Sequence, residues 1–289
     1  MNSNHSCSAF FAAVIAAVLM GSLGFFVRES ACSAEGCAFA RFLIGLVLVA
    51  GLLGWQCARG KGSFAFSLPS ALSGAGISLC ILFYFMAIQN ISVGIAALML
   101  YTGPFFAALG EAVLTRRMPS KRDSLLMLMS VAGILAVSLC NTGEVQGGFA
   151  GIVYGLLSGV CYAAYILLNR QIPQSVSLYQ RTFWQFVAGS LLLVVPLLLS
   201  DAPYSGLAQG WPYVLCIGLC QGFLVMLLVA YAVRYLTAIQ YGSISYLEPA
   251  VAVLLGALLY AEVLTPMQWC GFALIITASV LQSLLPRKA

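Results

Sequence analysis

Charge is scarce in this chain. Of its 289 residues only 7% are charged and 62% are hydrophobic, and the only histidine is His5. A water-soluble domain of this size could not bury so much apolar surface in a single core. The composition therefore excludes a soluble protein and predicts one that is embedded in a membrane.

Several motifs of enzymes and ATP-driven pumps are also absent. The chain contains no Gly-x-x-x-x-Gly-Lys-[Ser/Thr] loop for nucleotide phosphates and no Gly-x-Ser-x-Gly element for a nucleophilic serine. Among its ten cysteines, Cys216 and Cys220 lie four apart, but a metal site would need further ligands. We therefore expect no catalytic residues, no metal and no cofactor.

Long apolar stretches are what the chain does contain. A bilayer core of about 30 Å needs roughly 20 apolar residues of helix to cross it. Ten stretches reach that length, with approximate limits 8–27, 36–57, 69–90, 92–114, 122–141, 148–168, 180–200, 211–233, 239–260 and 266–285. The shortest break is 87–94, where we expect a tight hairpin. The predicted fold class is an all-α membrane protein with ten transmembrane helices.

The basic residues predict the orientation of these helices. Lys and Arg remain mainly on the cytoplasmic side. Eleven of the thirteen fall in gaps or at span ends on the side of the N-terminus: Arg59, Lys61, Arg116, Arg117, Lys121, Arg122, Arg170, Arg181, Arg234, Arg287 and Lys288. We therefore expect a multi-pass membrane protein with both termini in the cytoplasm, surrounded by the lipid bilayer. The pI of about 8.7 reflects this topology and does not indicate nucleic acid binding.

The two halves of the chain resemble one another. At an offset of 145 residues, the pair Tyr101 and Pro104 matches Tyr246 and Pro249, at similar depths in the fourth and ninth spans. Helix bends are therefore expected at Pro104 and Pro249. With five helices in each half, the second copy must enter the membrane inverted. The chain thus divides into two inverted five-helix repeats, 1–144 and 145–289, an architecture suited to alternating access.

Specific motifs carry a family resemblance. In the first half they are residues 84–92 and Tyr-Thr-Gly-Pro at 101–104. In the second half they are residues 231–237, 246–250 and 260–265. Through these motifs both halves of the chain resemble EamA-type transporters of the drug/metabolite transporter superfamily. The second half has the family's Glu-Pro pair, whereas the first half has Arg117 at the position of Glu262. The resemblance implies a ten-helix inner-membrane carrier with a central cavity for a small-molecule substrate. It leaves the cargo open.

Glu248 is the first candidate site residue. A carboxylate within an apolar helix costs several kcal/mol unless it is paired or faces water, and the neighbouring Pro249 loosens the helix. Glu248 could bind a substrate ammonium or a proton, or it could stabilise the bend. Aromatic residues inside the spans could contact substrate through ring faces or simply pack between helices. They are Tyr84, Tyr101, Tyr162, Tyr165, Trp184, Tyr231 and Tyr246.

Three further features have two interpretations each. Arg41 lies near the outer end of the second span, where its long stem could reach the surface, and we expect an anchor. Cys32 and Cys37 could form a disulfide or remain free thiols. Small-residue stripes permit close helix contact, either internally or in a homodimer. The stripes are Gly151, Gly155 and Gly159, and Gly218 with Gly222.

These patterns favour a secondary transporter of a small organic metabolite such as an amino acid, with export as the favoured direction. One alternative is an uptake carrier for a quaternary amine, a purine or a vitamin. A membrane enzyme that transports nothing is disfavoured, because the spans contain no nucleophile with a base and no metal cluster.

The orientation can be tested with reporter fusions. A green fluorescent protein fused after Ala289 should fluoresce and an alkaline phosphatase fused there should be inactive, because the eleven basic residues hold that side in the cytoplasm. An active phosphatase at this position would show that the number of spans is wrong.

Overall fold

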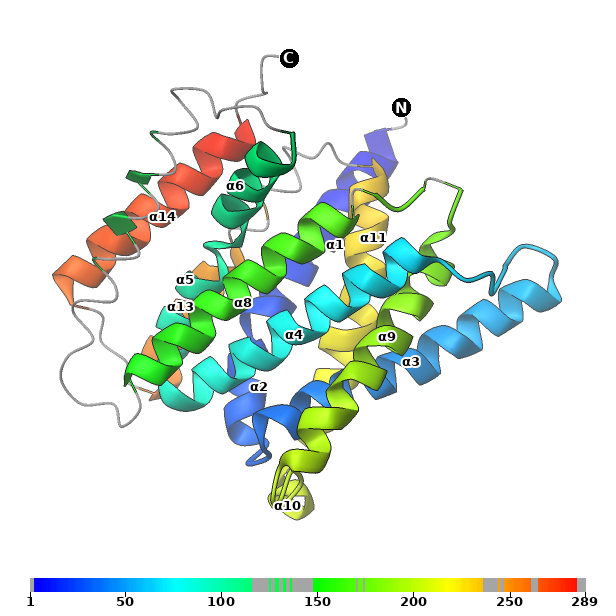
Figure 1. The fold of residues 1–289 in the computed structure, drawn as a ribbon, viewed down its shortest axis with the longest axis horizontal. Coiled ribbons are helices and arrows are strands. Elements are labelled where there is room, and N and C mark those ends of the chain that lie inside the picture. The colour runs from blue at the N-terminus through cyan, green and yellow to red at the C-terminus, as the bar shows by residue number, and fades with distance from the viewer. Residues whose placement is uncertain are drawn as a thin grey trace.

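The computed structural model describes residues 3–115, 125, 128–129, 132–133, 136, 148–169, 171–173, 175–235, 244, 247–260 and 265–284, and this part of the chain is helical without strands. The elements are α1 (Ser3–Gly21), α2 (Leu23–Glu29), α3 (Ala34–Ala58), α4 (Leu68–Asn90), α5 (Val93–Leu100), α6 (Gly103–Thr115), α8 (Gly148–Asn169), α9 (Leu178–Leu199), α10 (Leu207–Cys216), the π-helix η1 (Ile217–Leu224), α11 (Val225–Tyr235), α13 (Leu247–Tyr260) and α14 (Pro266–Leu284). Figure 1 shows them as one helical bundle.

Six of the expected spans are confirmed as long apolar helices. They are Ser8–Glu29, Ala34–Ala58, Leu68–Asn90, Gly148–Asn169, Leu178–Leu199 and Leu207–Val229, each of which could cross a membrane by length and composition. The expected fourth span is divided into α5 and α6. Most of the expected span 122–141 and the first part of 239–260 lie outside the described residues.

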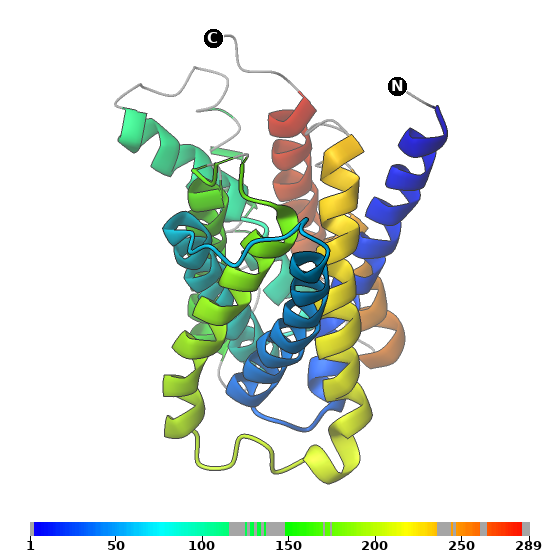
Figure 2. The ribbon, with the colours of Figure 1, turned by 90° about the vertical axis from the view of Figure 1, so that its right-hand side faces the viewer.

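Both described ends of the chain lie at the same end of the bundle. We call this the near end, where α1 begins and α14 ends, and we call the opposite end, with loops 30–33 and 200–206, the far end (Figure 2). An even number of crossings requires this arrangement, and the expected ten helices agree with it.

Serine side chains define where several helices begin. Ser33, Ser92 and Ser177 precede α3, α5 and α9, and each side chain accepts a hydrogen bond from the backbone N–H three residues later, at 3.1, 3.2 and 3.3 Å. Such caps satisfy N–H groups that have no partner within the helix. Only Ile91 and Ser92 separate α4 from α5, so the expected tight hairpin is confirmed.

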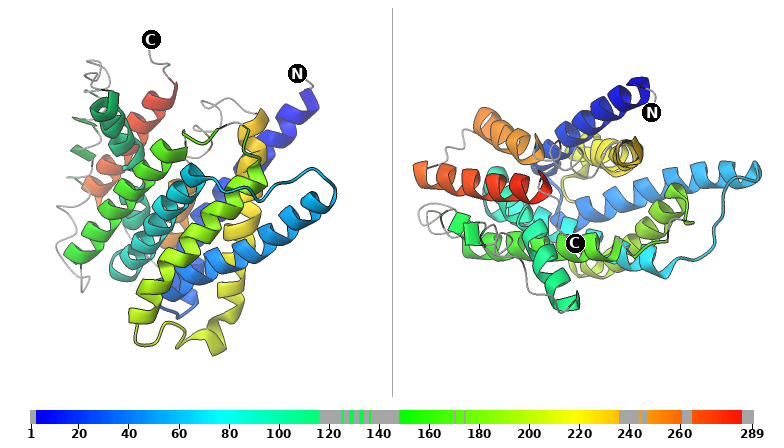
Figure 3. Two further views of the ribbon diagram at one scale, coloured as in Figure 1. Left: turned by 45° about the vertical axis from the view of Figure 1, so that its right-hand side comes forward. Right: turned by 90° about the horizontal axis from the view of Figure 1, so that it is seen from above.

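The core is built around α4, which packs between α8 and α9 (Figures 1 and 3). Glycines bring further helices close to α8 and α9: Gly155 of α8 faces Met99 of α5, and Gly189 of α9 faces the ring of Phe42 of α3. Phe42 also meets Phe186 edge to face, with ring centroids 5.5 Å apart. The glycine stripe of α8 is therefore used inside the molecule, one of the two interpretations that the sequence allows.

The outer surface is apolar where lipid would lie. Phe149, Leu198 and Leu199 are 78–82% exposed, and further large apolar side chains point outward from α3, α8, α9 and α13. A surface of this kind is stable only in contact with hydrocarbon or another apolar partner. It agrees with the membrane location inferred from composition.

The two cysteines of the far end are free thiols. Cys37 Sγ lies 3.1 Å from the Ser30 hydroxyl, and no disulfide joins Cys37 to Cys32. Burial raises the pKa of the Cys32 thiol in the loop. Because the thiolate is the reactive form, this environment disfavours oxidation of Cys32.

The close approach of α4 and α9 gives a stability test. A Cβ atom added at Gly74 would lie 2.5 Å from the Cα of Gln185, which is backbone and cannot move easily. Gly74→Ala should therefore destabilise the protein by about 1–3 kcal/mol, measured as a lower thermal denaturation temperature in detergent. Gly54→Ala in α3 is the matched control, because a Cβ there has no atom within 4 Å. Equal melting of both variants would contradict this packing.

Candidate functional site

Interrupted helices meet in the middle of the bundle. The helix pair α1 and α2 is broken at Ser22, and α5 and α6 are separated by Tyr101 and Thr102. The π-helix η1 lies between α10 and α11, and α13 begins at Leu247. Breaks and π-helical turns leave backbone groups without their helical hydrogen bonds, and they are frequent at functional sites.

Hydroxyl groups compensate for two of these breaks. The Ser22 hydroxyl donates to the Leu19 carbonyl at 2.8 Å, and the Thr102 hydroxyl donates to the Met99 carbonyl at 2.6 Å. Each hydroxyl satisfies a carbonyl near a helix end, where the helical hydrogen-bond pattern stops. The breaks are therefore stable features of a buried region.

A small chamber lies between the breaks. Its volume is about 20 Å³, which is room for about one water molecule. Residues from α1, α2, α4, α5 and α13, together with Tyr101, line it: Met20, Gly21, Leu23, Ile81, Tyr84, Ala97, Leu100, Tyr101, Glu248 and Ala252. The chamber is thus formed by both halves of the chain.

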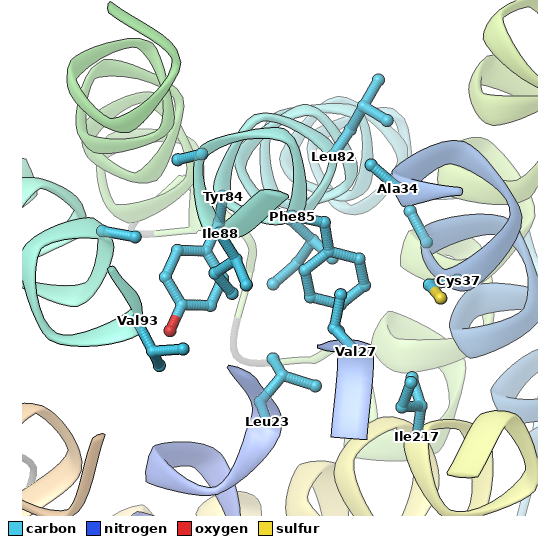
Figure 4. Packing of buried hydrophobic residues seen from close by; sticks show 14 of the residues in the cluster. Leu23, Val27, Ala34, Cys37, Leu82, Tyr84, Phe85, Ile88, Val93 and Ile217 are labelled. Atoms are coloured by element: carbon cyan, nitrogen blue, oxygen red, sulfur yellow. The ribbon is translucent and has the colours of Figure 1, made fainter. Parts of the chain in front are cut away.

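Three residues that the sequence analysis selected meet in this chamber. Tyr84, Tyr101 and Glu248 all line it, and a hydrogen bond joins the Tyr101 hydroxyl to the Glu248 carboxyl group. Figure 4 shows the Tyr84 ring extending from α4 between Leu23 and Val93, with its hydroxyl pointing away from α4. The structure therefore places a carboxyl group and two phenols around one buried space.

Two other predicted tyrosines lie beside this group without lining the chamber. Tyr162 and Tyr165 of α8 stack with ring centroids 6.0 Å apart. Tyr162 contacts Gly103, the first residue of α6, and the backbone of Tyr165 lies against Gly76 of α4. They pack against α4 and the start of α6, behind the break at Tyr101 and Thr102.

The remaining predicted aromatics are placed elsewhere. Trp184 donates its indole N–H to the Ala65 carbonyl at 3.0 Å, next to the loop between α3 and α4. The Tyr231 hydroxyl is 2.9 Å from the Ser8 hydroxyl, between α11 and α1. Tyr246 lies outside the described residues.

The two predicted bend prolines lie in first turns of helices. Pro104 is the second residue of α6, directly after the break at Tyr101 and Thr102. Pro249 is the third residue of α13. Proline is tolerated in the first turn because its missing N–H would have no helical partner there.

Arg41 differs from the surface anchor that we expect from the sequence. Its side chain is only 7% exposed and points toward the break between α1 and α2, where Nη2 donates to Met20 Sδ at 3.6 Å. Its guanidinium is within electrostatic range of Glu248 and Tyr84. A cation is therefore buried directly behind the chamber wall.

Gln221 of η1 is a functional candidate that the sequence analysis missed. It is fully buried, and its amide nitrogen donates to the Leu19 carbonyl at 3.2 Å and the Ser22 hydroxyl at 3.3 Å. The only signal in the sequence is an amide side chain in the middle of an apolar stretch. Its neighbour Gly222 lets η1 pack against the backbone of Arg41.

A larger cavity opens at the far end. Its volume is about 460 Å³, and the ends of α2 and α4 line it with Val27, Arg28, Ala31, Cys32, Ile88, Gln89, Asn90 and Ile91. Leu23 of the chamber wall and Ile88 of the vestibule wall belong to one buried apolar cluster with Val93 (Figure 4), and we call these three residues the apolar layer between chamber and vestibule. The chamber is therefore sealed toward the vestibule by close hydrophobic packing.

Polar contacts hold the far end together across α2, α4 and α13. Arg28 Nη2 donates to the Ile91 carbonyl at 2.9 Å, and its guanidinium lies 4.7 Å from the centroid of the Tyr260 ring. The Tyr260 hydroxyl donates to Glu29 at 2.9 Å. We call Arg28, Glu29 and Tyr260 the far-end clamp.

Comparison with known proteins agrees with this architecture. The sequence profile described as "EamA-like transporter family" matches residues 8–139 and again 149–284. The chain is similar to an "Uncharacterized transporter" of Archaeoglobus fulgidus, at 27% identity with 92% of each chain covered. It is also similar to the "Threonine/homoserine exporter RhtA" of Escherichia coli K12, at 26% identity over 88% of this chain and 83% of that protein.

The fold is also found among solved structures. One titled "Crystal structure of protein" superposes with a TM-score of 0.63 at 17% identity, covering 96% of this chain and 97% of the other. At this identity the match shows a common fold. The two profile matches together extend over most of the sequence, and the chain belongs to the EamA-like transporter family.

Proposed function

We propose that the protein is a secondary transporter that exports a small organic metabolite, such as an amino acid, across the cytoplasmic membrane by alternating access. The observation that carries this proposal is the chamber between interrupted helices, with the Glu248 carboxyl group in its wall. Carriers bind cargo near the membrane midplane between broken helices of two repeats, where backbone groups are available.

The size of the chamber supports a mechanism in which helices separate. Sites for small organic ligands have volumes of about 300–1,000 Å³, whereas the chamber has about 20 Å³. Cargo can therefore enter only when the walls move apart. The vestibule of about 460 Å³ at the far end has a suitable size for the route on that side.

The duplicated profile match supports two structural repeats. The two matched segments fall within the proposed repeats 1–144 and 145–289. Five helices per repeat would invert the second copy, so that opening one side of the chamber mirrors opening the other.

Export is the direction that one named relative favours. The RhtA protein of Escherichia coli is named as an exporter of threonine and homoserine. With the basic near end in the cytoplasm, the vestibule would face outward. An exporter would then release cargo through the far end.

Glu248→Gln tests the role of the carboxyl group. The change keeps the shape of the side chain but removes the charge that would hold an ammonium or a proton. We expect a protein that folds normally and whose transport falls by about tenfold or more, or loses its dependence on pH. The measurement is efflux from proteoliposomes loaded with amino acids, purines, quaternary amines and riboflavin, analysed by mass spectrometry at acidic and alkaline pH.

Glu35→Gln is the control for this experiment. Glu35 lies in the first turn of α3 near the far-end surface, away from the chamber, and its variant should transport like the wild type. Unchanged efflux of every compound across pH by folded Glu248→Gln would exclude a coupling or binding role for Glu248.

Tyr260→Phe tests the far-end clamp. The change keeps the ring beneath Arg28 but removes the hydrogen bond to Glu29. Because such a bond stabilises by about 0.5–1.5 kcal/mol, the chamber should open to the far side about twofold to tenfold more often. A cysteine placed at Ala97, which lines the chamber, should then react faster with a membrane-impermeant maleimide.

Two comparisons make this result interpretable. Protein without the cysteine at residue 97 gives the background from native thiols, and Tyr179→Phe at the start of α9 removes a hydroxyl distant from the clamp. Identical labelling rates for Tyr260→Phe and Tyr179→Phe would show that the clamp does not control access.

A further inference from the structure

Arg41 is a buried cation with weak partners. Nη2 donates only to the thioether of Met20, at 3.6 Å, and Nη1 has no hydrogen-bond partner within the described part of the chain. A thioether is a poor acceptor. A guanidinium buried for structural reasons would be expected to contact carboxylates or backbone carbonyls, which would offset the cost of removing it from water.

A second unpartnered atom lies on the helix that packs against Arg41. The Gln221 carboxamide oxygen has no hydrogen-bond partner among the described residues, although its nitrogen is bonded to the Leu19 carbonyl and Ser22. The amide of Gln221 and the guanidinium of Arg41 thus both reach the same break, residues 19–22. A donor of Arg41 and an acceptor of Gln221 are therefore available for hydrogen bonds next to the chamber.

A carboxyl group lies on the other side of Met20 from Arg41. Glu248 lines the chamber, and Met20 lies in the same wall and contacts Arg41. Movement of the flexible Met20 side chain would join the guanidinium to the chamber. One space would then have a cation on one side and a carboxyl group on the other.

We propose that Arg41 binds the carboxylate of the cargo, with Glu248 facing its ammonium group, so that the transported compound is a zwitterion. The inference rests on the proposed transport function and names the class of cargo. A guanidinium fits a carboxylate because it offers two parallel N–H donors. Met20 occupies the place of the carboxylate in the closed chamber and is displaced when cargo binds.

The test compares compounds that differ in a single charged group. Proteoliposomes are loaded with an equimolar mixture of amino acids, their carboxamides, their decarboxylated amines and the corresponding deaminated acids, and efflux is followed by mass spectrometry. We expect efflux of amino acids, and efflux at least about tenfold slower for derivatives that lack the carboxylate or the ammonium.

Variants of Arg41 connect this selectivity to the residue. Arg41→Gln should slow amino acid efflux by about tenfold to hundredfold, and Arg41→Lys should retain part of it because it keeps the charge but not the planar pair of donors. Arg59→Gln, at the residue directly after the same helix, is the matched control, since Arg59 is exposed and lies over the Trp55 ring. It should leave efflux unchanged.

A stability measurement separates binding from a structural role. Arg41→Met replaces the cation with an apolar side chain of similar length in an apolar site. Its thermal denaturation temperature in detergent should equal or exceed that of the wild type, while its amino acid efflux is lost. A clear drop in stability with unchanged selectivity would show that Arg41 is structural.

The outcomes also separate this inference from the proposed function. Efflux of carboxamides or amines as fast as that of amino acids, or wild-type efflux by Arg41→Gln, would overturn the inference and leave the carrier proposal intact. If no compound in this mixture is exported but purines or riboflavin are, the cargo is not a zwitterion; the inference is then overturned and the carrier proposal is kept. Absence of efflux for all compounds tested would count against both.

Discussion

The rest of the structure depends on one constraint, which is that hydrocarbon offers no hydrogen-bond partners. Every break in a helix must therefore be satisfied within the protein. The hydroxyls of Ser22 and Thr102 do this for two breaks by bonding to nearby carbonyls. The same requirement brings the interrupted helices together, because an irregular backbone is tolerated only where other helices shield it from lipid. A site in the middle of the bundle is the consequence.

Close packing around this site depends on residues without large side chains. Gly21 lies against the start of α13, and Gly24 of α2 lies against Val93. The contact of Gly21 with α13 brings the two halves of the chain together at the chamber. In the apolar layer, Leu23 and Val93 belong to the short helices α2 and α5, whereas Ile88 belongs to the end of the long helix α4. Short helices can separate from α4 at lower cost than the long helices of the core can separate from one another.

Much of the fold could be predicted from the sequence because hydrocarbon thickness fixes the length of a spanning helix. Ranges such as 36–57 and 69–90 agree closely with α3 and α4, and the proline at residue 104 indicated the break that follows Leu100. The π-helix had no comparable signal. Its eight residues contain no proline, and their apolar character is the same as that of an unbroken helix.

The site was predictable only in part. Tyr84, Tyr101 and Glu248 line the chamber, whereas Trp184 lies beside the loop between α3 and α4 and Tyr231 lies between α11 and α1. Spacing along one helix does not tell which side of that helix faces the centre. Arg41 illustrates the same limit, since only the contact with Met20 shows that its side chain points inward.

The π-helix has a consequence for the length of the chain. An α-helix turns by about 100° per residue, and a π-helical segment contains a residue beyond what that repeat allows. Removal of one residue from Ile217–Leu224 would close the wide turn into a regular α-helix and leave α11 facing α1. Insertion of one residue has no such outlet and would rotate α11 by roughly 100° relative to α10. Tyr231 would then no longer lie opposite Ser8. The segment therefore tolerates a shorter chain more readily than a longer one.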